Sequence, residues 1–438
     1  MNYPNSMIML EGFNPTLDYA LELDRNDKLS RFRERFYIPE NTIYVDGNSL
    51  GLLSHDAEQS LLRVLNEWKH LGIRGWLEGQ RPWFYFGEQM GEMAADIVGA
   101  EKGELVFSGT TTVNIHALVS TFYQPAGKRT KILADELNFP SDIYALEGQI
   151  KIKGLDPKKE LLLAKSHDGR TLDEKAIVEL MTDEVALVYL PSVLYASGQL
   201  LDMEYLTAEA HKRGIPIGFD CSHSAGAVPH YFSKWGVDFA TFCSYKYLNG
   251  GPGCAAFIYI NKKHLGKEPM LAGWFGYVKE KQFDMSLQFE HAQNAGGWQI
   301  SSPGVLGSST MEGALQITLE AGIENIRQKS LMLTNYFMRL VENTLSMPPF
   351  NFSMVTPPEA KNRGGHIALT HPEEALRINE ALKARGIIPD FRQPDIIRIA
   401  PIALYNTYQE VWQVAKALRE IVENKEFERF PTHRKAIS

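Results

Sequence analysis

Short apolar runs alternate with amphipathic helical stretches between residues 104 and 243, and this rhythm constrains the fold more than any other feature. The runs are ELVFSG, TKILAD, ELLLAK, VALVYLP, IPIGFD and DFATFC, and stretches such as EYLTAEAHKRG separate them. Strand–helix alternation of this kind predicts an α/β fold, with a mostly parallel sheet and helices on both faces. A seventh run, CAAFIYIN, adds a further strand, for which an antiparallel direction is an alternative.

The chain is too long for a single hydrophobic core. Its 438 residues exceed the size at which single cores stop growing, so two domains are expected. Beyond residue 310 comes a long helical stretch, GIENIRQKSLMLTNYFMRLVE, followed by shorter strand and helix patterns typical of an α+β domain. We therefore predict a large domain over residues 51–312 and a smaller C-terminal domain over residues 313–438. Residues 1–50 are expected to form an arm that joins the small domain.

Composition excludes several classes of protein. The net charge of −8 argues against nucleic acid as a partner, because phosphate binding needs concentrated Lys and Arg. Only three cysteines occur, so we expect no disulfide framework, no cysteine-rich zinc centre and no other metal site. No stretch approaches the roughly 18 to 20 apolar residues of a membrane span. The first residues, MNYPNSMIML, do not resemble a signal peptide, and a cytoplasmic location is expected.

Chemically active residues follow the predicted strands at the points where ligands bind in α/β sheets. Asp220 ends the run IPIGFD, and Lys246 follows DFATFC between two tyrosines and before a glycine-rich turn. Thr111 and Thr112 open a helix after ELVFSG, where free backbone N–H groups and hydroxyls suit a phosphate. These features together fit pyridoxal 5'-phosphate (PLP), which has a phosphate, a protonated ring nitrogen and an aldehyde. The sequence therefore predicts that Lys246 carries PLP and that Tyr245 contacts its phosphate.

Seven motifs resemble those of kynureninase, the PLP enzyme that cleaves kynurenine. They are GNSLG, TTTVNIHALVSTFYQP, FPSDIYA, FDCSHSAGAVPHYFSKWGVDFA, CSYKYLNGGPG, GWFG and IRIAPIALYN, in that order. The resemblance implies the PLP-dependent transferase-like fold of aminotransferase class V, fold type I, with a seven-stranded sheet. It also implies hydrolysis of L-kynurenine to anthranilate and L-alanine in tryptophan degradation. The enzyme would be a homodimer with its active sites at the subunit interface.

The resemblance also implies how individual residues would hold PLP. Lys246 matches the Schiff-base lysine, and Asp220 matches the carboxylate that pairs with the pyridinium nitrogen. His223 matches the histidine that supports this aspartate, and Phe139 matches the aromatic residue that stacks on the ring. The complete set of matched cofactor contacts is Thr111, Thr112, Phe139, Asp142, Asp220, His223, Tyr245, Lys246, Trp274 and Ser302. The residues expected to be catalytic are Lys246, Asp220 and Tyr245.

Substrate contacts are implied in the same way. Arg398, in IIRIAP, matches the arginine whose planar fork grips the α-carboxylate, and Ser49, in GNSLG, matches a small-residue loop at the substrate. Trp274 and Ser302 match positions that reach the phosphate of the neighbouring subunit. Trp76 replaces a histidine that faces the substrate's aromatic ring in some relatives. Because an indole ring offers little to a buried 3-hydroxyl, we expect L-kynurenine to be preferred over 3-hydroxy-L-kynurenine.

Two other functions stay open at this stage. One is a cysteine desulfurase or an aminotransferase of the same fold. A desulfurase needs a nucleophilic cysteine on a mobile loop, whereas Cys221 and Cys243 fall at predicted strand ends and Cys254 begins a strand. The other is a non-catalytic PLP-binding or regulatory protein. The loss of Lys246 or Arg398 would favour that function, but both residues are present.

Overall fold

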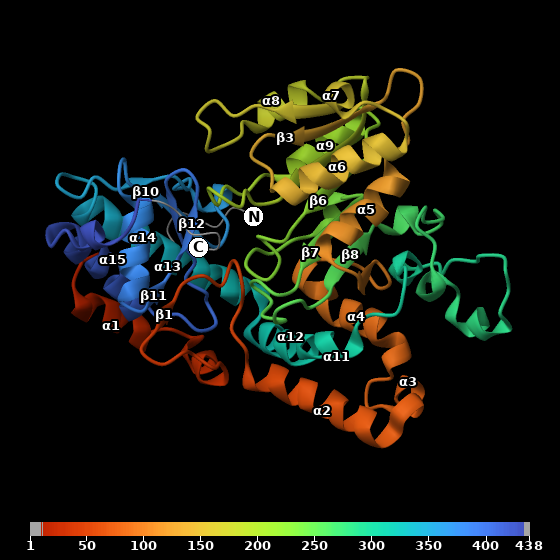
Figure 1. Cartoon of the computed structure of the whole chain (residues 1–438), viewed down its shortest axis with the longest axis horizontal. Coiled ribbons are helices and arrows are strands. Elements are labelled where there is room, and N and C mark those ends of the chain that lie inside the picture. Colours follow the sequence, from red (N-terminus) through yellow and green to blue (C-terminus); the bar gives the residue numbers. More distant parts are fainter. Residues whose placement is uncertain (1–9, 11, 433–438) are drawn as a thin grey trace.

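A seven-stranded sheet forms the centre of the larger half of the molecule (Figure 1). The computed structural model describes residue 10 and residues 12–432, so the start of the predicted arm and residues 433–438 lie outside it. In spatial order the strands are β2 (Leu105–Phe107), β8 (Ala256–Ile260), β7 (Phe239–Cys243), β6 (Ile217–Asp220), β5 (Val185–Pro191), β3 (Lys131–Asp135) and β4 (Leu161–Ala164). β8 runs antiparallel to both its neighbours, and the other pairs are parallel. The predicted sheet is therefore confirmed.

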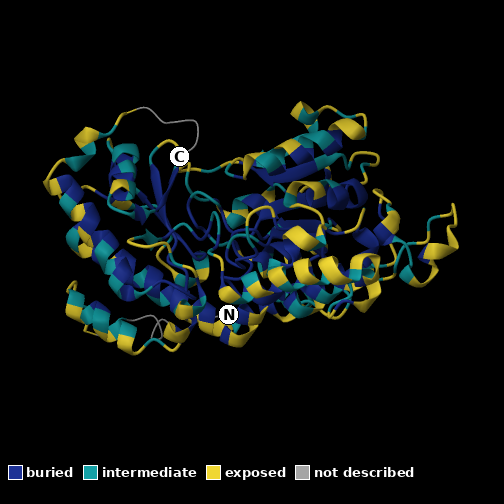
Figure 2. Ribbon diagram, turned by 60° about the horizontal axis from the view of Figure 1, so that its bottom comes forward, coloured by how far each residue is buried: buried dark blue, intermediate teal, exposed yellow. Residues whose placement is uncertain are grey.

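Helices cover both faces of this sheet. They are α2 (His55–Leu71), α3 (Gly75–Glu78), α4 (Phe86–Val98), α5 (Thr111–Phe122), α6 (Pro140–Ile152), α7 (Pro157–Glu160), α8 (Glu174–Glu179), α9 (Met203–Lys212), α10 (Phe232–Trp235), α11 (Val305–Ser308) and α12 (Thr310–Ala321). Alternate residues of the central strand β5 serve the two faces, as the pleat requires. Val188 and Leu190 pack in the cluster under α4, α9 and α12, whereas Leu187 and Tyr189 pack in the cluster under α5 and α6. Figure 2 shows the strands almost entirely buried.

Helix α2 is capped at its start but leaves an apolar face uncovered. The Ser54 side chain caps the helix by accepting a hydrogen bond from the backbone N of Ala57 at 3.1 Å. Ala57 and Val64 are buried on the side that packs against α12. Leu65 and Trp68, which continue the apolar pattern, are exposed. The hydrophobic pattern of α2 therefore exceeds what this chain alone can cover.

The C-terminal half contains a four-stranded antiparallel sheet. Its strands, in spatial order, are β12 (Asp390–Arg392), β13 (Ile396–Ile399), β10 (Ile367–Thr370) and β9 (Ser353–Met354). Its helices are α13 (Ile323–Thr344), α14 (Ala375–Ala384) and α15 (Tyr408–Glu423). The predicted α+β character is confirmed, and the short strand β12 was not predicted. The boundary expected between residues 312 and 313 lies inside α12, whose Met311 and Leu315 belong to the large-domain core.

The N-terminal segment packs on this C-terminal half. Helix α1 (Leu17–Arg25) lies against α15, and Asp24 accepts hydrogen bonds from the backbone N of Tyr408 and of Gln409 at 2.7 and 2.9 Å. Lys329 of α13 and Asp27 form a buried ion pair at 2.7 Å. Strand β1 (Ile43–Tyr44) pairs in parallel with β11 (Ile387–Ile388). These contacts bring residues from the two ends of the chain together beside the large sheet.

Candidate active site

The predicted amine and carboxylate lie at the same edge of the large sheet. Asp220 is the last residue of β6, and Lys246 follows the neighbouring strand β7. The Nζ atom of Lys246 is 3.0 Å from Nε2 of His223. Burial, together with the nearby positive charges of Lys246 and Arg398, lowers the pKa of His223 well below its usual value. The imidazole is therefore neutral, and Nε2 accepts an N–H from Lys246, which holds the amine at the strand end.

The GNSLG loop explains how the lysine turn is held in place. The backbone N of Gly51 donates a 2.7 Å hydrogen bond to the carbonyl oxygen of Tyr245. A Cβ atom at Gly51 would clash with the carbonyl oxygen of Lys246 and with Asn249. Glycine is needed here because two backbones meet without room for a side chain. The loop that carries Ser49 is therefore fixed against the turn that carries the amine.

Asp142, in the first turn of α6, is fully buried beside Asp220. Burial and the Asp220 carboxylate raise the pKa of Asp142 well above its ordinary value, because two adjacent carboxylates resist ionising together. Asp142 is then protonated and donates a hydrogen bond to Asp220. Asp220 also accepts from the backbone N of Ser222 at 2.7 Å. The pair presents one negative charge, which suits one ring N–H cation.

The start of α5 offers unpaired donors at the same sheet edge. Thr110 occupies the N-cap position but makes no side-chain cap hydrogen bond. The Thr111 hydroxyl is buried and has no hydrogen-bond partner among the described residues, and Thr112 is exposed. Helix α5 follows β2, which runs parallel to β7, so it begins at the edge where Lys246 lies. An uncapped helix N-terminus with an orphaned hydroxyl fits a phosphate group.

Two aromatic side chains complete the predicted cofactor contacts in this chain. Phe139, at the N-cap of α6, is 43% exposed, and its ring lies 5.2 Å from that of Tyr195 in an edge-to-face contact. It therefore has a free face for another ring. Burial raises the pKa of Tyr245, so its hydroxyl keeps its proton at neutral pH. The Lys246 Nζ atom lies 6.0 Å from the centre of the Tyr245 ring.

Arg398 reaches the same site from β13 and is almost fully buried. Its Nε donates to Asp390 at 2.5 Å, its Nη1 to the carbonyl oxygen of Tyr195 at 2.7 Å, and its Nη2 to the Ser49 hydroxyl at 3.0 Å. Asp390 also accepts from Nε of Arg392 at 2.8 Å. One carboxylate thus holds two guanidinium groups, which leaves positive charge for an incoming anion. The neutral Ser49 hydroxyl is the partner that a carboxylate can displace at least cost.

Sequence reasoning missed three residues of this cluster. Asp390 faces Arg398 directly in the β12–β13 pair, and a turn signal, the Gln-Pro within FRQPD, could have placed them opposite one another. His366 is fully buried with its ring 5.9 Å from that of His223, and no sequence pattern marks it. Asp46 precedes Ser49 in the same loop. Burial and the Asp390 charge raise the pKa of Asp46 to about 6.

Two predicted site residues lie apart from this cluster within one chain, and a third, Ser302, lies near its phosphate end. Trp76 packs against Trp83 and Phe275, with ring centres 6.0 Å away in each case. Trp274, next to Phe275, is 45% exposed. Ser302 lines a cavity of about 500 Å³ that reaches the residues at the start of α5. Their expected role across a subunit interface stays a prediction.

Comparison with known proteins identifies the family. Residues 326–418 match the model of the kynureninase C-terminal domain. A curated kynureninase of Geobacillus thermodenitrificans is 56% identical over 427 residues, which covers 98% of this chain and 99% of the relative. This chain belongs to the kynureninase family. Kynureninases of Bacillus cereus and Shouchella clausii are 54% and 51% identical, with 98% and 97% of this chain covered.

Solved structures confirm the fold of this kynureninase-family chain. A cysteine desulfurase from Thermococcus onnurineus superposes with a TM-score of 0.74 at 18% identity, covering 90% of this chain and 98% of that one. A C-DES variant with glycine linked to its PLP cofactor gives a TM-score of 0.76 at 17% identity, covering 89% and 99%. All three cysteines of this chain are buried, and burial raises the pKa of each thiol. They are poor candidates for the exposed nucleophile that a desulfurase needs.

The residues at the sheet edge fit the cofactor of the family, PLP. The Thr111 hydroxyl and Nδ1 of His223 are buried polar atoms without hydrogen-bond partners among the described residues. A phosphate and a ring oxygen would satisfy such groups. Lys246, Phe139 and Asp220 supply the amine, the aromatic face and the carboxylate.

Among the described residues, no helix has the length and apolar content to cross a membrane.

Proposed function

We propose that this chain hydrolyses L-kynurenine at the bond between its β- and γ-carbons, giving anthranilate and L-alanine with PLP as cofactor. One molecule of water is consumed, so the atoms balance. The observation that carries the proposal is the meeting of Lys246 and the Asp142–Asp220 pair with Arg398 at one edge of the sheet. Full-length relatives named kynureninase support the substrate class.

The cofactor would be held by groups that match its chemistry. When bound, PLP supplies an electron sink that makes bonds at the substrate's α-carbon breakable. The Asp142–Asp220 pair would keep the ring nitrogen protonated, because it carries one negative charge. The uncapped N–H groups of α5 and the Thr111 hydroxyl would hold the phosphate. Phe139 would cover one face of the ring.

Substrate orientation depends on Arg398. Its Nε and Nη1 are fixed by Asp390 and the Tyr195 carbonyl oxygen, and its Nη2 contacts both Asp390 and the Ser49 hydroxyl. A guanidinium held on two sides loses little freedom when it binds an anion, so the α-carboxylate meets a preformed partner. The substrate's α-carboxylate would displace the Ser49 hydroxyl as the hydrogen-bond partner of Nη2. This fixes the α-carbon near the amine of Lys246.

Proton transfers would be carried by two side chains. Nζ of Lys246, held by neutral His223, is placed to accept the proton of the substrate's α-carbon and to return it later. The Tyr245 hydroxyl keeps its proton because burial raises its pKa, so it can donate to the carbon left by bond cleavage. Water adds to the γ-ketone, and cleavage of the bond sends anthranilate away as the leaving product.

A product assay tests the reaction. The purified enzyme with PLP should release anthranilate and L-alanine in equal amounts from L-kynurenine, measured by chromatography. The matched control is Lys246→Arg, which keeps the charge but cannot carry the aldehyde. Equal product from the variant, or alanine without anthranilate from the wild type, would refute the proposed reaction.

We also propose that two chains build each active site. Trp76 and Trp274 lie apart from Lys246 in their own chain, and Trp274 is partly exposed. The exposed apolar face of α2, with Leu65 and Trp68, supports a surface for a second copy of the chain. The segment between β8 and α11 also projects from the large domain, in green to teal in Figure 1. A twofold dimer would place each chain's projection at its partner's site.

Hybrid dimers test this arrangement. Trp274→Ala and Lys246→Ala should each be nearly inactive alone. If Trp274 acts on the partner's site, mixed dimers regain one intact site, and a co-refolded equal mixture should recover about a quarter of wild-type activity. Sedimentation of the same samples checks the dimer. No recovery in a confirmed mixed dimer would place Trp274 in its own chain's site.

Substrate preference would follow from the same interface. We propose that Trp76 borders the aromatic ring of the substrate and offers an apolar face with no partner for a 3-hydroxyl. The expected result is a higher kcat/KM for L-kynurenine than for 3-hydroxy-L-kynurenine. Trp76→His should narrow or reverse this difference, whereas Trp83→Phe, a change in the neighbouring ring, should not. Equal values for both substrates in the wild type would contradict the assignment of Trp76.

The remaining proposals concern the domain boundaries, the metabolic pathway and the cellular location. We propose that the domain boundary lies at Gly322, between α12 and α13, because α12 packs in the large-domain core and α13 in the C-terminal one. The N-terminal arm would belong with the small domain through α1 and β1. A place in tryptophan degradation follows from the proposed substrate. The cytoplasmic location stays a prediction.

A further inference from the structure

The hairpin that carries Arg398 is held to the large domain at its tip. Asp395 lies in the turn between β12 and β13, and Nη2 of Arg170 donates to both of its carboxylate oxygens, at 2.6 and 2.8 Å. The Thr370 hydroxyl, at the end of β10, donates to the same carboxylate at 2.7 Å. The Arg170 and Asp395 side chains are 26% and 29% exposed, so their ion pair is partly shielded from water and salt. It joins the two halves of the molecule.

The loop that presents Arg170 is held in one conformation by its own hydrogen bonds. It follows β4, at the carboxyl edge of the large sheet, and in Figure 1 it extends from beside α8 toward the C-terminal half. The Asp168 carboxylate accepts from the backbone N of Arg170 and of Thr171, each at 2.7 Å. It also accepts from the hydroxyls of Ser166 and Thr171, at 2.9 and 2.7 Å. Because the loop is already ordered, Arg170 loses little freedom when it pairs with the hairpin.

The same loop is joined to the segment that contacts Arg398. The Gln199 side chain donates to the carbonyl oxygen of Leu172 and accepts from its backbone N, both at 2.8 Å. Tyr195, four residues before Gln199, accepts from Nη1 of Arg398 at its carbonyl oxygen, at 2.7 Å. The contacts therefore close a ring, whose members in order are Asp395, Arg170, Leu172, Gln199, Tyr195 and Arg398.

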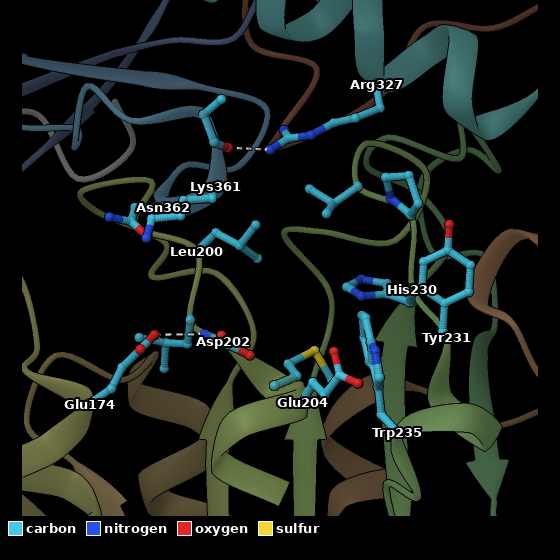
Figure 3. Close-up of a pocket in the computed structure, with 15 residues that line it drawn as sticks. Glu174, Leu200, Asp202, Glu204, His230, Tyr231, Trp235, Arg327, Lys361 and Asn362 are labelled. Carbon is cyan, nitrogen blue, oxygen red and sulfur yellow. Dashed lines mark hydrogen bonds between the residues drawn. The ribbon is translucent and has the colours of Figure 1, made fainter. Parts of the chain in front are cut away.

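The segment that follows Tyr195 is itself fixed to the C-terminal half. The backbone N of Leu200 donates to the carbonyl oxygen of Asn362 at 2.9 Å. Arg327 of α13 holds the neighbouring carbonyl oxygen of Ala360 at 2.8 Å. Figure 3 shows Leu200, Asn362 and Arg327 at this junction, beside a cavity of about 230 Å³. The hairpin is therefore held against a segment whose own position is fixed.

We propose that Arg170 and Asp395 are positioning residues for the binding of the substrate's α-carboxylate. They hold the β12–β13 hairpin so that Arg398, which faces Asp390 across the two strands, keeps the orientation that receives a carboxylate. They act through Arg398 and not by contact with the substrate. A preformed partner binds an anion with a smaller loss of freedom, so the pair increases affinity. This inference rests on the proposed role of Arg398 in substrate binding.

Binding of L-alanine to the PLP-loaded enzyme tests the pair without the proposed cleavage, because L-alanine has an α-amine and an α-carboxylate but no γ-ketone. The change in the cofactor's absorption band gives the Kd. Arg170→Gln and Asp395→Asn should each raise this Kd about three- to tenfold, and the double variant should raise it no further than either single change. With L-kynurenine, the same variants should raise KM and leave kcat within about twofold of wild type.

The matched control is Glu426→Gln. Glu426 accepts two hydrogen bonds from Arg385, at 2.9 and 2.6 Å, and these side chains are 19% and 26% exposed, but both belong to the C-terminal half. This variant should lower the melting temperature about as much as Asp395→Asn and leave the Kd of L-alanine unchanged. In an Arg398→Lys background, Asp395→Asn should no longer change the Kd, because the fork that it positions is gone.

Three results would overturn the proposal. They are an unchanged Kd in both single variants, an equal rise in Glu426→Gln, and a further rise when Asp395→Asn is added to Arg398→Lys. If the wild type forms no anthranilate but the L-alanine results are as expected, the proposed reaction fails and the positioning pair stands.

Discussion

Replacing Arg398 by lysine should lower kcat/KM sharply while leaving PLP bound. The substitution keeps the positive charge but removes the planar fork. In the structure this fork is held by Asp390 and the Tyr195 carbonyl oxygen, and its Nη2, which also pairs with Asp390, donates to Ser49. A lysine ammonium is a single point donor on a flexible stem and cannot keep both supports while it binds substrate. The orientation of the α-carboxylate is therefore lost.

The size of the effect follows from the lost contacts. A hydrogen bond to a charged group contributes about 1.5–3 kcal/mol. Loss of one arm of the carboxylate pair therefore predicts a decrease in kcat/KM of about 10- to 100-fold, since about 1.4 kcal/mol corresponds to a factor of ten. Asp390 keeps Arg392 as a partner, so no uncompensated buried carboxylate is created. The fold should therefore survive the change.

The assay is initial-rate formation of anthranilate from L-kynurenine, with the cofactor absorption spectrum recorded in parallel. The matched control is Arg392→Lys, which makes the same chemical change at a more exposed arginine that shares Asp390. Arg392→Lys should lower kcat/KM by less than a few-fold. If Arg398→Lys keeps kcat/KM within threefold of wild type, or if Arg392→Lys loses as much, Arg398 is a structural residue and the reasoning fails.

Three further predictions concern the cofactor and the sheet edge. Lys246→Ala should abolish turnover and any cofactor link trapped by borohydride, and normal steady-state activity in this variant would remove Lys246 from its role. Asp220→Asn should still fold but lose on the order of a hundredfold or more in kcat, and near-normal kcat would reject its pairing with the ring nitrogen. Burial raises the pKa of Asp135, at the end of β3, to about 7, so its charge destabilises the folded state increasingly as pH rises from about 4 to 7. Asp135→Asn should therefore raise the melting temperature more at pH 8 than at pH 5, and an equal change at both values would contradict the shift.

The large sheet was predictable because its strands are buried on both faces. Such strands appear as continuous apolar runs, and VALVYLP became β5 with all seven residues buried. The short strands β1, β11 and β12 have only two or three residues each, too few to show a period. They form because distant segments meet, as when Ile43 pairs with Ile387. No local pattern in the sequence contains that information.

Only part of the candidate site was predictable from the sequence, as with the fold. Asp220 and Lys246 were found because strand ends and their own chemistry both mark them. The hydrogen bond between Ser49 and Arg398 joins residues 349 positions apart, and only the resemblance to a family suggested that both belong to the site. The proton shared by Asp142 and Asp220 depends on burial, which sequence does not give. The resemblance to a family therefore identified residues such as Ser49 and Arg398. The structure added the side chains that hold them and the protonation of the Asp142–Asp220 pair.

The structure of a single chain does not explain the positions of Trp76 and Trp274. Both contact aromatic neighbours in the same outlying region, and neither contact is with the lysine turn. An exposed tryptophan costs free energy in water unless another surface covers it, so Trp274 and Trp68 are better explained by a partner than by this chain alone. If the dimer forms as proposed, the unexplained apolar face of α2 and the incomplete substrate pocket have the same cause. A fully active monomer would contradict this common cause and leave both the apolar face of α2 and the substrate pocket unexplained.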